Sequence, residues 1–301
     1  IDDLVPLQKN DTVVVTQYPM QVLEYLGLLK FDFLGLRNLT VIRDCVRAIQ
    51  KEHPDFSIDQ IPIDDADVYK MIARGETTGV FQFESAGMRR VLTRLMPENL
   101  EDLTAVLSLY RPGPRDSIDK FIENRRHPEK ITYAHPLLEP ILNVTNGCIV
   151  YQEQVMEICR SLAGYSYGRA DVVRRAMSKK KIDVMEKERT AFVSGCEKNG
   201  ISSSVANTIF DQMSEFAKYA FNKSHAACYA LVAYRTAYLK CYYPAEFMAA
   251  LMTSVLDQSN KIARYTAECK RLGIRLASAT INTSMQGFTP NGRVINYGLL
   301  G

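Results

Sequence analysis

Apolar side chains recur every three to four residues along most of this chain, the spacing that places them on one face of a helix. Asn38 is a suitable cap for the first such helix, and Pro54 would end it. Similar patterns predict further helices over residues 68–72, 85–95, 100–110, 117–126, 152–162, 169–177, 184–196, 203–216, 226–242, 245–255 and 261–272. The sequence therefore predicts a mainly α fold.

Short apolar runs predict only a few strands, at Leu29–Leu34, Gly79–Phe83, Cys148–Tyr151 and Arg293–Tyr297. On the first strand, Lys30 and Asp32 would share one face, opposite Leu29, Phe31 and Phe33. No apolar run approaches the roughly 18 residues that a membrane span requires, so we expect no membrane partner.

The composition is that of an ordinary globular protein of 301 residues, 47% hydrophobic and 24% charged. It excludes a disordered tail, a collagen-like chain and a disulfide scaffold, and the length suggests about two domains. The seven cysteines form no C-x-x-C pair and stand apart from the four histidines, so we expect no zinc site and a cytoplasmic location. Because the chain opens on Ile1 rather than Met, we expect a piece of a longer protein.

The net charge of +3 conceals a segregation of charge along the chain. Residues 54–68 contain aspartates and no Lys or Arg, whereas residues 169–181 are densely basic. Residues 217–240 combine basic side chains with tyrosines and contain no acid. These local excesses of positive charge indicate where a phosphate-bearing partner could bind.

Asp32 is the first candidate for chemistry. A single carboxylate framed by large apolar residues on a rigid strand is how two-metal phosphoryl-transfer enzymes hold a metal ligand. An edge strand with one charged, solvated face is the simpler interpretation, because one Asp cannot hold two metals. The residues alone favour this second interpretation.

Arg174 and Arg175, followed by Lys179–Lys181, form the second candidate site. Arg forks and Lys ammonium groups match phosphate oxygens in geometry and charge, so this cluster could hold a triphosphate. Arg175 lies one turn from Asp171 and could pair with it instead. Anion binding and a solvated basic helix end both remain open.

The third candidate site follows Phe221. Ser224 is a natural N-cap for the next helix, which would place Lys223, Ser224 and His225 at a helix N-terminus, where anions are favoured. A capping loop without a ligand is the alternative. There is no G-x-S-x-G motif and no acid close to His225 in sequence, so we do not expect a nucleophilic triad.

Seven motifs occur in order along the chain: Lys30–Leu36, Phe81–Ser85, Arg111–Pro114, Tyr151–Met156, Arg174–Met177, Phe221–His225 and Tyr243–Met248. Together, from about Gln17 to Ile274, they resemble the alpha-subunit family of bacterial DNA polymerase III, the family C replicative polymerases. Each motif is modest by itself, but the ordered set is highly specific.

This resemblance implies that residues 1–38 end a polymerase β-like palm and supply its last strand. Residues 39–276 would be the helical fingers domain, and residues 277–301 would start the region before a helix-hairpin-helix. It implies template-directed addition of dNTPs to a primer 3′ end by two-metal nucleotidyl transfer. The implied partners are primer–template DNA, dNTP and, through regions outside this chain, the sliding clamp and other holoenzyme subunits.

The resemblance also implies roles for single residues. Asp32 matches a catalytic Asp that binds Mg²⁺, and Lys30 matches a Lys that approaches the triphosphate. Arg174 and Arg175 match the pair that contacts the triphosphate. The resemblance places the remaining nucleotide-binding candidates near the nascent base pair: Asn222, Lys223, Ser224 and His225. The sequence contains no Walker A or G-x-G-x-x-G motif.

One departure from the family pattern matters for activity. The P-D-x-D-x-D motif that carries the other two catalytic carboxylates does not occur in this chain. Two Mg²⁺ ions would therefore not be fully ligated, and we expect the chain alone to be inactive. The alternatives are a non-catalytic helical module that binds nucleic acid or another anion, and an interaction scaffold that uses the acidic stretch around Asp64.

Overall fold

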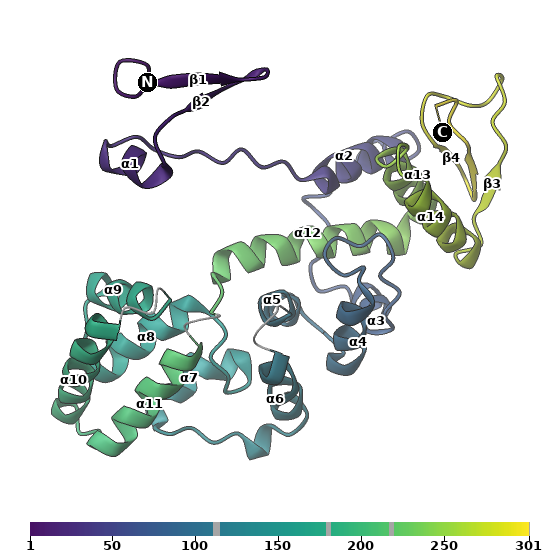
Figure 1. The fold of residues 1–301 in the computed structure, drawn as a ribbon. Coiled ribbons are helices and arrows are strands. Elements are labelled where there is room, and N and C mark those ends of the chain that lie inside the picture. The colour runs from purple at the N-terminus through teal and green to yellow at the C-terminus, as the bar shows by residue number, and fades with distance from the viewer. Residues whose placement is uncertain (111–114, 179–181, 217–219, 301) are drawn as a thin grey trace. The chain divides into compact units, whose positions relative to one another are not determined.

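The computed structural model describes residues 1–110, 115–178, 182–216 and 220–300. The chain divides into two compact units, Ile1–Arg37 (unit 1) and Asn38–Gly301 (unit 2), which are described separately. Most described residues are helical, which confirms the predicted fold class (Figure 1). The predicted turn Arg111–Pro114 and the lysines Lys179–Lys181 lie outside the described residues.

Unit 1 consists of a β-hairpin and a short helix that the sequence analysis did not predict. Strands β1 (Leu7–Asn10) and β2 (Val13–Thr16) pair antiparallel, and helix α1 (Met20–Tyr25) follows. The predicted strand Leu29–Leu34 is wrong, because residues 28–36 have no regular structure. A strand needs a neighbour for its backbone hydrogen bonds, and none of the described residues pairs with this segment.

Unit 2 begins with α2 and ends in a small sheet. Its helices are α2 (Arg37–Ile49), α3 (Ala66–Ala73), α4 (Ala86–Leu95), α5 (Leu100–Leu109), α6 (Arg115–Arg126), α7 (Glu139–Leu142), α8 (Gln152–Ala163), α9 (Tyr167–Ser178), α10 (Ile182–Lys198), α11 (Ser203–Phe216), α12 (Lys223–Tyr242), α13 (Pro244–Thr253) and α14 (Ser259–Arg271). Short 3₁₀ turns flank α7 at Pro128–Lys130, Pro136–Leu138 and Asn143–Thr145. The helix predictions are therefore confirmed, with ends that differ by a few residues.

The C-terminal sheet has the order β3–β5–β4, with β3 (Arg275–Ala277) parallel and β4 (Thr289–Asn291) antiparallel to β5 (Val294–Asn296). The predicted strand over residues 293–297 is confirmed as β5. The predicted strand over 79–83 is wrong, because Gly79 (φ 80°) and Gln82 (φ 61°) adopt left-handed conformations that interrupt an extended run. The run 148–151 contributes a single bridge, at Tyr151.

Side-chain caps fix several helix starts. Asp65 Oδ1 accepts from two amides at the start of α3, and Ser85 Oγ accepts from Met88 N at 3.2 Å, as predicted for α4. The cap of α12 is Asn222 rather than the predicted Ser224, which lies inside the helix. Asn222 has an extended backbone and caps as well as Ser, so the helix starts earlier. Asn38 likewise lies inside α2.

Buried apolar side chains stabilise unit 2, and the described residues include two extended clusters of them. One joins α8, α9, α10 and α11 around Ile158, Phe192 and Phe210. The other joins α2, α13, α14 and the C-terminal sheet around Phe247 and Met252. Figure 1 shows α12 running from the first group of helices to the second. No helix in the described ranges is long and apolar enough to cross a membrane.

The small residues of α12 let its neighbours approach closely. Ala226, Ala230, Ala233 and Ala237 are fully buried along the helix, which contacts α3, α5 and α13. An Ala row leaves little side chain between two backbones, so α5 and α3 can lie against α12. This packing places the N-terminus of α12 beside loops that come from distant parts of the sequence.

Lys240 carries a charge into the interior of unit 2, where it is 1% exposed. Its Nζ donates to the carbonyl oxygens of Glu76 and Thr78, both at 2.8 Å, and to Glu268 Oε1 at 2.6 Å. Arg271 also donates to the Glu268 carboxylate. This network connects α12 and α14 to the segment that follows α3.

We expect Lys240→Met to lower the free energy of unfolding by about 3 kcal/mol, because it leaves a buried carboxylate and two carbonyls without their donor. Urea unfolding measures the loss. The matched control is Lys270→Met on the exposed side of α14, with an expected change within about 0.5 kcal/mol. Equal effects of the two substitutions would contradict a structural role for the buried ammonium.

The same network predicts a pH dependence of stability. Burial would raise the pKa of Glu268, but hydrogen bonds from Arg271 and Lys240 outweigh it and lower the pKa from 4.5 to about 2. A lowered carboxyl pKa stabilises the fold above the unfolded pKa and loses that effect as the pH falls through the folded one. The destabilisation by Glu268→Gln, measured by urea unfolding, should therefore shrink between pH 4.5 and about pH 2. A constant difference across this window would refute the assignment.

Candidate functional site

The first residues of α8 and the residues before α12 lie side by side. Tyr151 and Phe221 form a parallel bridge, in which Gln152 N donates to Phe221 O at 2.9 Å and Phe221 N donates to Val150 O at 3.1 Å. The motifs Tyr151–Met156 and Phe221–His225, about 70 residues apart, therefore meet in one place.

Glu153 joins the two helix starts. Its carboxylate accepts from the backbone amide of Lys223 at 3.1 Å and from Asn222 Nδ2 at 2.9 Å. Asn222 Oδ1 in turn accepts from His225 N at 2.8 Å. An acid beside a helix N-terminus is favourable, but it also means that the Lys223 and His225 amides already have protein acceptors. An anion at this helix end would compete with Glu153 and Asn222.

The Lys223 side chain is also engaged. Its Nζ lies 3.2 Å from Glu101 Oε2 and 5.3 Å from the centroid of the Tyr151 ring. Ser224 and His225 are exposed on the first turn of α12. The predicted residues Asn222, Lys223, Ser224 and His225 thus form one polar surface at the start of α12.

Arg174 and Arg175 share one carboxylate. Arg174 donates from Nε and Nη2 to Asp171 Oδ1, at 2.9 and 2.6 Å, and Arg175 Nε donates to Asp171 Oδ2 at 2.7 Å. These hydrogen bonds, first from Arg174 and then from Arg175, lower the pKa of Asp171. The Arg174 side chain is 21% exposed and that of Arg175 is 62% exposed. Arg174 is therefore fixed, whereas Arg175 faces solvent.

Gln152 connects the arginine pair to the start of α12. Its Oε1 accepts from Arg174 Nη1 at 3.0 Å, and its Nε2 donates to Ala220 O at 3.1 Å. Gln152 therefore connects Arg174 on α9 to the segment that precedes α12. No role was predicted for Gln152, although its position at a helix start inside the motif Tyr151–Met156 was an available signal.

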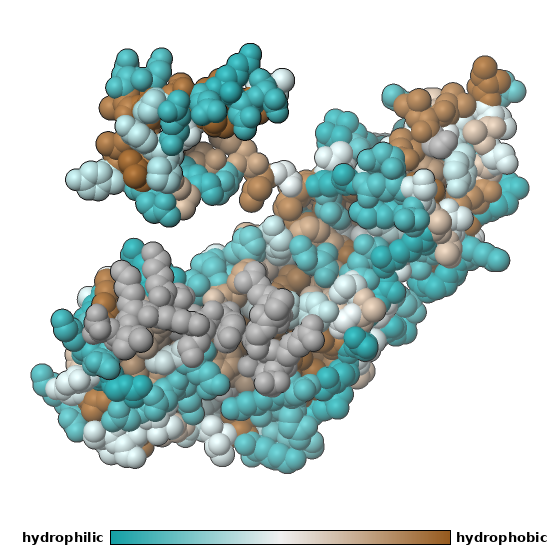
Figure 2. Space-filling view, in the orientation of Figure 1, coloured by the Kyte–Doolittle hydropathy of each residue, from teal (hydrophilic) through white to brown (hydrophobic). Residues whose placement is uncertain are grey.

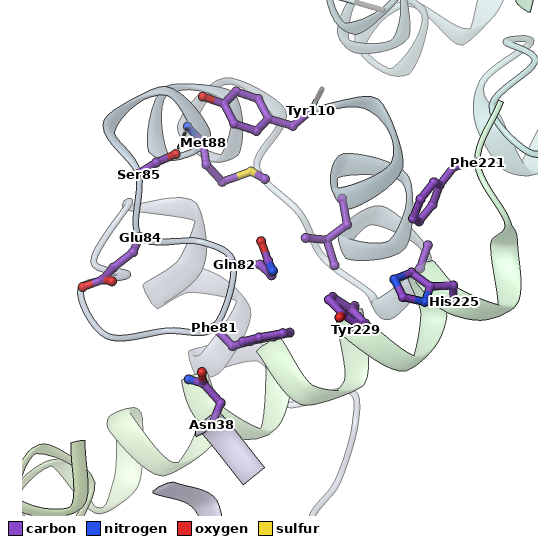
Figure 3. Close-up of a pocket in the computed structure, with 12 residues that line it drawn as sticks. Asn38, Phe81, Gln82, Glu84, Ser85, Met88, Tyr110, Phe221, His225 and Tyr229 are labelled. Atoms are coloured by element: carbon purple, nitrogen blue, oxygen red, sulfur yellow. Dashed lines mark hydrogen bonds between the residues drawn. The ribbon is translucent and has the colours of Figure 1, made fainter. Parts of the chain in front are cut away.

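A pocket of about 580 Å³ opens beside the first turns of α12 (Figure 3). Four ring side chains form a continuous aromatic row along it. The ring centroids are 5.1 Å apart for Phe81 and Tyr229, 4.3 Å for Tyr229 and His225, and 5.4 Å for His225 and Phe221. The other lining residues are Asn38, Gln82, Glu84, Ser85, Met88, Leu107, Tyr110 and Ala226.

The loop over residues 77–85 is held rigidly where it borders this pocket. Thr77 Oγ1 donates to Phe83 O at 2.7 Å, and Phe81 N donates to Thr236 Oγ1 of α12 at 3.1 Å. Gln82, between these bonds, has a φ of 61°. A left-handed non-glycine residue persists only where the surroundings over-determine it. The amide of Gln82 is thereby presented to the pocket (Figure 3).

Glu84 closes the same loop on its far side. Its Oε1 accepts from Gly79 N at 3.0 Å and lies 3.4 Å from Arg264 Nη2. Figure 3 shows its carboxylate pointing away from the centre of the pocket. The sequence did not predict that Gln82, Tyr110 and Tyr229 line a pocket. Two of them carried a signal, since Gln82 lies in the motif Phe81–Ser85 and Tyr229 lies in the tyrosine-rich residues 217–240.

Lys30 and Asp32 belong to unit 1 and form an ion pair with each other, with 3.2 Å between Nζ and Oδ2. The described residues contain no group of three or more His, Cys, Asp or Glu side chains that could hold a metal ion. Mg²⁺ requires an octahedral set of oxygens, so one carboxylate beside an ammonium does not fit it. The magnesium site stays a prediction for Asp32 together with ligands from elsewhere.

Comparison with known proteins places these motifs in one family. The DNA polymerase III subunit alpha of Bacillus subtilis (strain 168) is 45% identical over 301 residues, covering 99% of this chain and 27% of that protein. The Escherichia coli (strain K12) protein of the same name is 45% identical over 315 residues, with 99% and 27% coverage. That of Staphylococcus aureus (strain COL) is 44% identical over 287 residues, with 95% and 27% coverage.

The chain therefore spans about 27% of the length of these relatives. The family model for the bacterial DNA polymerase III alpha subunit finger domain matches residues 38–200, which is more than half of the chain. This range contains the arginine pair, the α8 start and the loop that lines the pocket. The match and the ordered motifs show that the chain belongs to the family of bacterial DNA polymerase III alpha subunit finger domains.

Proposed function

We propose that this chain is the nucleotide-binding part of a replicative DNA polymerase III alpha subunit, which adds dNTPs to a primer 3′ end as a template directs. The observation that carries the proposal is the pair Arg174 and Arg175, which Gln152 links to the start of α12. Residues 1–38 would end the palm, 39–276 would form the fingers, and 277–301 would start the following region. The proposed location is the cytoplasm.

The arginine pair is suited to a triphosphate by its geometry and its charge. Two adjacent guanidinium groups share only one carboxylate, Asp171, so the cluster keeps an excess positive charge. A triphosphate offers several charged oxygens to the same forks and can replace Asp171 in bidentate hydrogen bonds. Arg174 would orient the phosphates from its fixed position, and the exposed Arg175 would close onto them.

The start of α12 supplies the neighbouring contacts. Lys223 can turn from Glu101 toward a phosphate, and the exposed Ser224 and His225 lie on the same turn. Asn222, held by Glu153, keeps this turn in place. We assign Asn222, Lys223, Ser224 and His225 to the surface that meets the nucleotide and its base pair.

Unit 1 supports the assignment to a palm by what it exposes. Leu29, Phe31, Phe33 and Leu34 are 79, 71, 95 and 90% exposed, and Figure 2 shows the apolar surface of this unit. Contiguous apolar side chains at a surface indicate a contact with further protein. In the complete subunit this segment would join a sheet, with Asp32 as a catalytic Mg²⁺ ligand and Lys30 near the triphosphate.

We expect Arg175→Ala to raise the KM for dNTP by about 10- to 100-fold in the complete subunit, because it removes a charge-assisted hydrogen bond to phosphate. Steady-state primer extension at varied dNTP concentration measures the change. The matched control is Arg47→Ala on α2, where an exposed Arg lies one turn from Asp44.

Arg47→Ala should leave the KM unchanged, and equal effects at the two positions would count against the triphosphate site. Arg264 is a poorer control than Arg47, because it contacts Glu84 at the edge of the pocket. An unchanged KM in Arg175→Ala with reduced affinity for DNA would favour the alternative, a module that binds nucleic acid through its basic face.

We expect the 301-residue chain by itself to incorporate no nucleotide, since Asp32 is its one carboxylate that matches the family's catalytic set. The measurement is extension of a labelled primer with Mg²⁺ and all four dNTPs, with the complete subunit as the positive control. Magnesium-dependent extension by the chain alone would show that its own residues complete the catalytic site.

A further inference from the structure

We propose that the pocket beside α12 binds the first unpaired base of the template strand, the base that follows the one paired with the incoming nucleotide. The inference rests on the proposed polymerase function and names a ligand for a pocket that the arginine pair does not line. The base would stack on the aromatic row of Phe81, Tyr229, His225 and Phe221.

The lining of the pocket is suited to a flat, uncharged ring. The aromatic row forms part of the lining, and Met88 and Leu107 add further apolar side chains to it. Stacking of a base on aromatic side chains is favourable and tolerates any sequence, because every base has a π-face. The volume of about 580 Å³ lies within the range of pockets that enclose small ligands.

The polar groups of the pocket do not select one base. Gln82 and Asn38 line it, and each carries an amide with both donors and an acceptor. An amide can therefore hydrogen-bond to the edge of any of the four bases. A template presents all four bases in turn, so a polymerase requires this lack of selectivity at an unpaired template position.

The charges separate this pocket from the triphosphate site. The described lining residues include no Lys or Arg, and the one carboxylate, Glu84, is engaged by Gly79 and Arg264. Phosphate groups would therefore meet no Lys or Arg side chain among these lining residues. A neutral base whose phosphates remain outside the pocket satisfies this distribution of charge.

The position of the pocket fits a base next to the nascent pair. Ala220 and Phe221 are consecutive residues, and one contacts Gln152 of the arginine site while the other lines the pocket. The segment before α12 therefore contacts both sites. A nucleotide held by Arg174 and Arg175 would have its base pair near α12, and the next template base would lie one step farther, toward the aromatic row.

The walls are rigid enough to hold a base unstacked from its neighbours. The 77–85 loop is bonded to α12 through Phe81 N and Thr236 Oγ1 at 3.1 Å. Elsewhere in the lining, a Cβ atom at Gly87 would overlap the hydroxyl of Tyr110. Helix α4, which carries Gly87, is therefore in tight contact with the Tyr110 side chain. A preformed pocket avoids the ordering cost that a mobile one would add to base binding.

The test uses the complete subunit with a dideoxy-terminated primer and the next correct dNTP. The first unpaired template position carries either a base or an abasic site, and fluorescence anisotropy gives the Kd for each DNA. The variant is Tyr229→Leu, and the matched control is Tyr238→Leu. Tyr238 lies on the same helix, stacks on Tyr242 at 4.8 Å and does not line the pocket.

We expect the wild type and Tyr238→Leu to bind the base-bearing template about tenfold more tightly than the abasic one, whichever of the four bases is present. In Tyr229→Leu this preference should fall to about twofold or less. A full tenfold preference in a folded Tyr229→Leu protein would overturn the inference. That result together with a raised KM for dNTP would assign the pocket to the incoming base instead.

A second variant keeps the test decisive if Tyr229→Leu fails to fold. Gln82→Gly tolerates the left-handed backbone and removes the side-chain amide together with its two methylene groups, so it should reduce the preference about threefold. An unchanged preference in Gln82→Gly would then overturn the inference. Failure of the proposed function has a different signature, since the wild-type subunit would not extend a primer and Arg175→Ala would not alter dNTP use.

Discussion

The buried ammonium of Lys240 is the constraint on which the arrangement of unit 2 depends. An unpaired charge inside a protein costs several kcal/mol, so the surrounding chain has to bring acceptors to it. It does so with one carboxylate from α14 and with the carbonyls of Glu76 and Thr78. The two carbonyls belong to the segment that leads into the 77–85 loop. The hydrogen bonds from the ammonium to these carbonyls therefore fix the start of the loop that carries Gln82 to the pocket.

Helix α12 extends this constraint from the interior to the site. Its 20 residues span about 30 Å, with Lys240 near one end and Asn222 as the cap at the other. Thr236, between them, holds the 77–85 loop a second time through Phe81 N. Half of the buried residues of this helix are alanines, so the helices that contact it can approach closely at those positions. Lys240 and Thr236, which lie inside unit 2, thus set the geometry of the pocket beside the N-terminal turns of α12.

The sequence predicted the helices because their apolar faces repeat at helical spacing, and this signal is local. Three other features depend on residues that are distant in sequence, so a local pattern could not predict them. At the start of α12, Glu153 accepts hydrogen bonds from the Asn222 side chain and from the Lys223 amide. Because Glu153 is distant in sequence, the residues adjacent to Asn222 and Ser224 could not indicate which of the two caps the helix. The left-handed conformation at Gln82 depends on Thr236, more than 150 residues away. The segment Leu29–Leu34 has the composition of a strand, but composition cannot supply a partner strand. The identities of the site residues came from ordered motifs, whereas the link through Gln152 required coordinates.

Asp171 shows how the chain would keep the proposed phosphate site ready without a ligand. Two adjacent guanidinium groups repel each other, and a helix that carried them unpaired would lose stability in the free protein. The carboxylate of Asp171, three residues before Arg174 and four before Arg175, pairs with both guanidinium groups and relieves that repulsion. A single carboxylate has too little charge to satisfy two guanidinium groups, so a more highly charged triphosphate can displace it. Gln152 keeps its hydrogen bond to Arg174 through such an exchange, because it does not use the groups that face Asp171. The contact between α9 and the start of α12 would therefore persist while the anion changes.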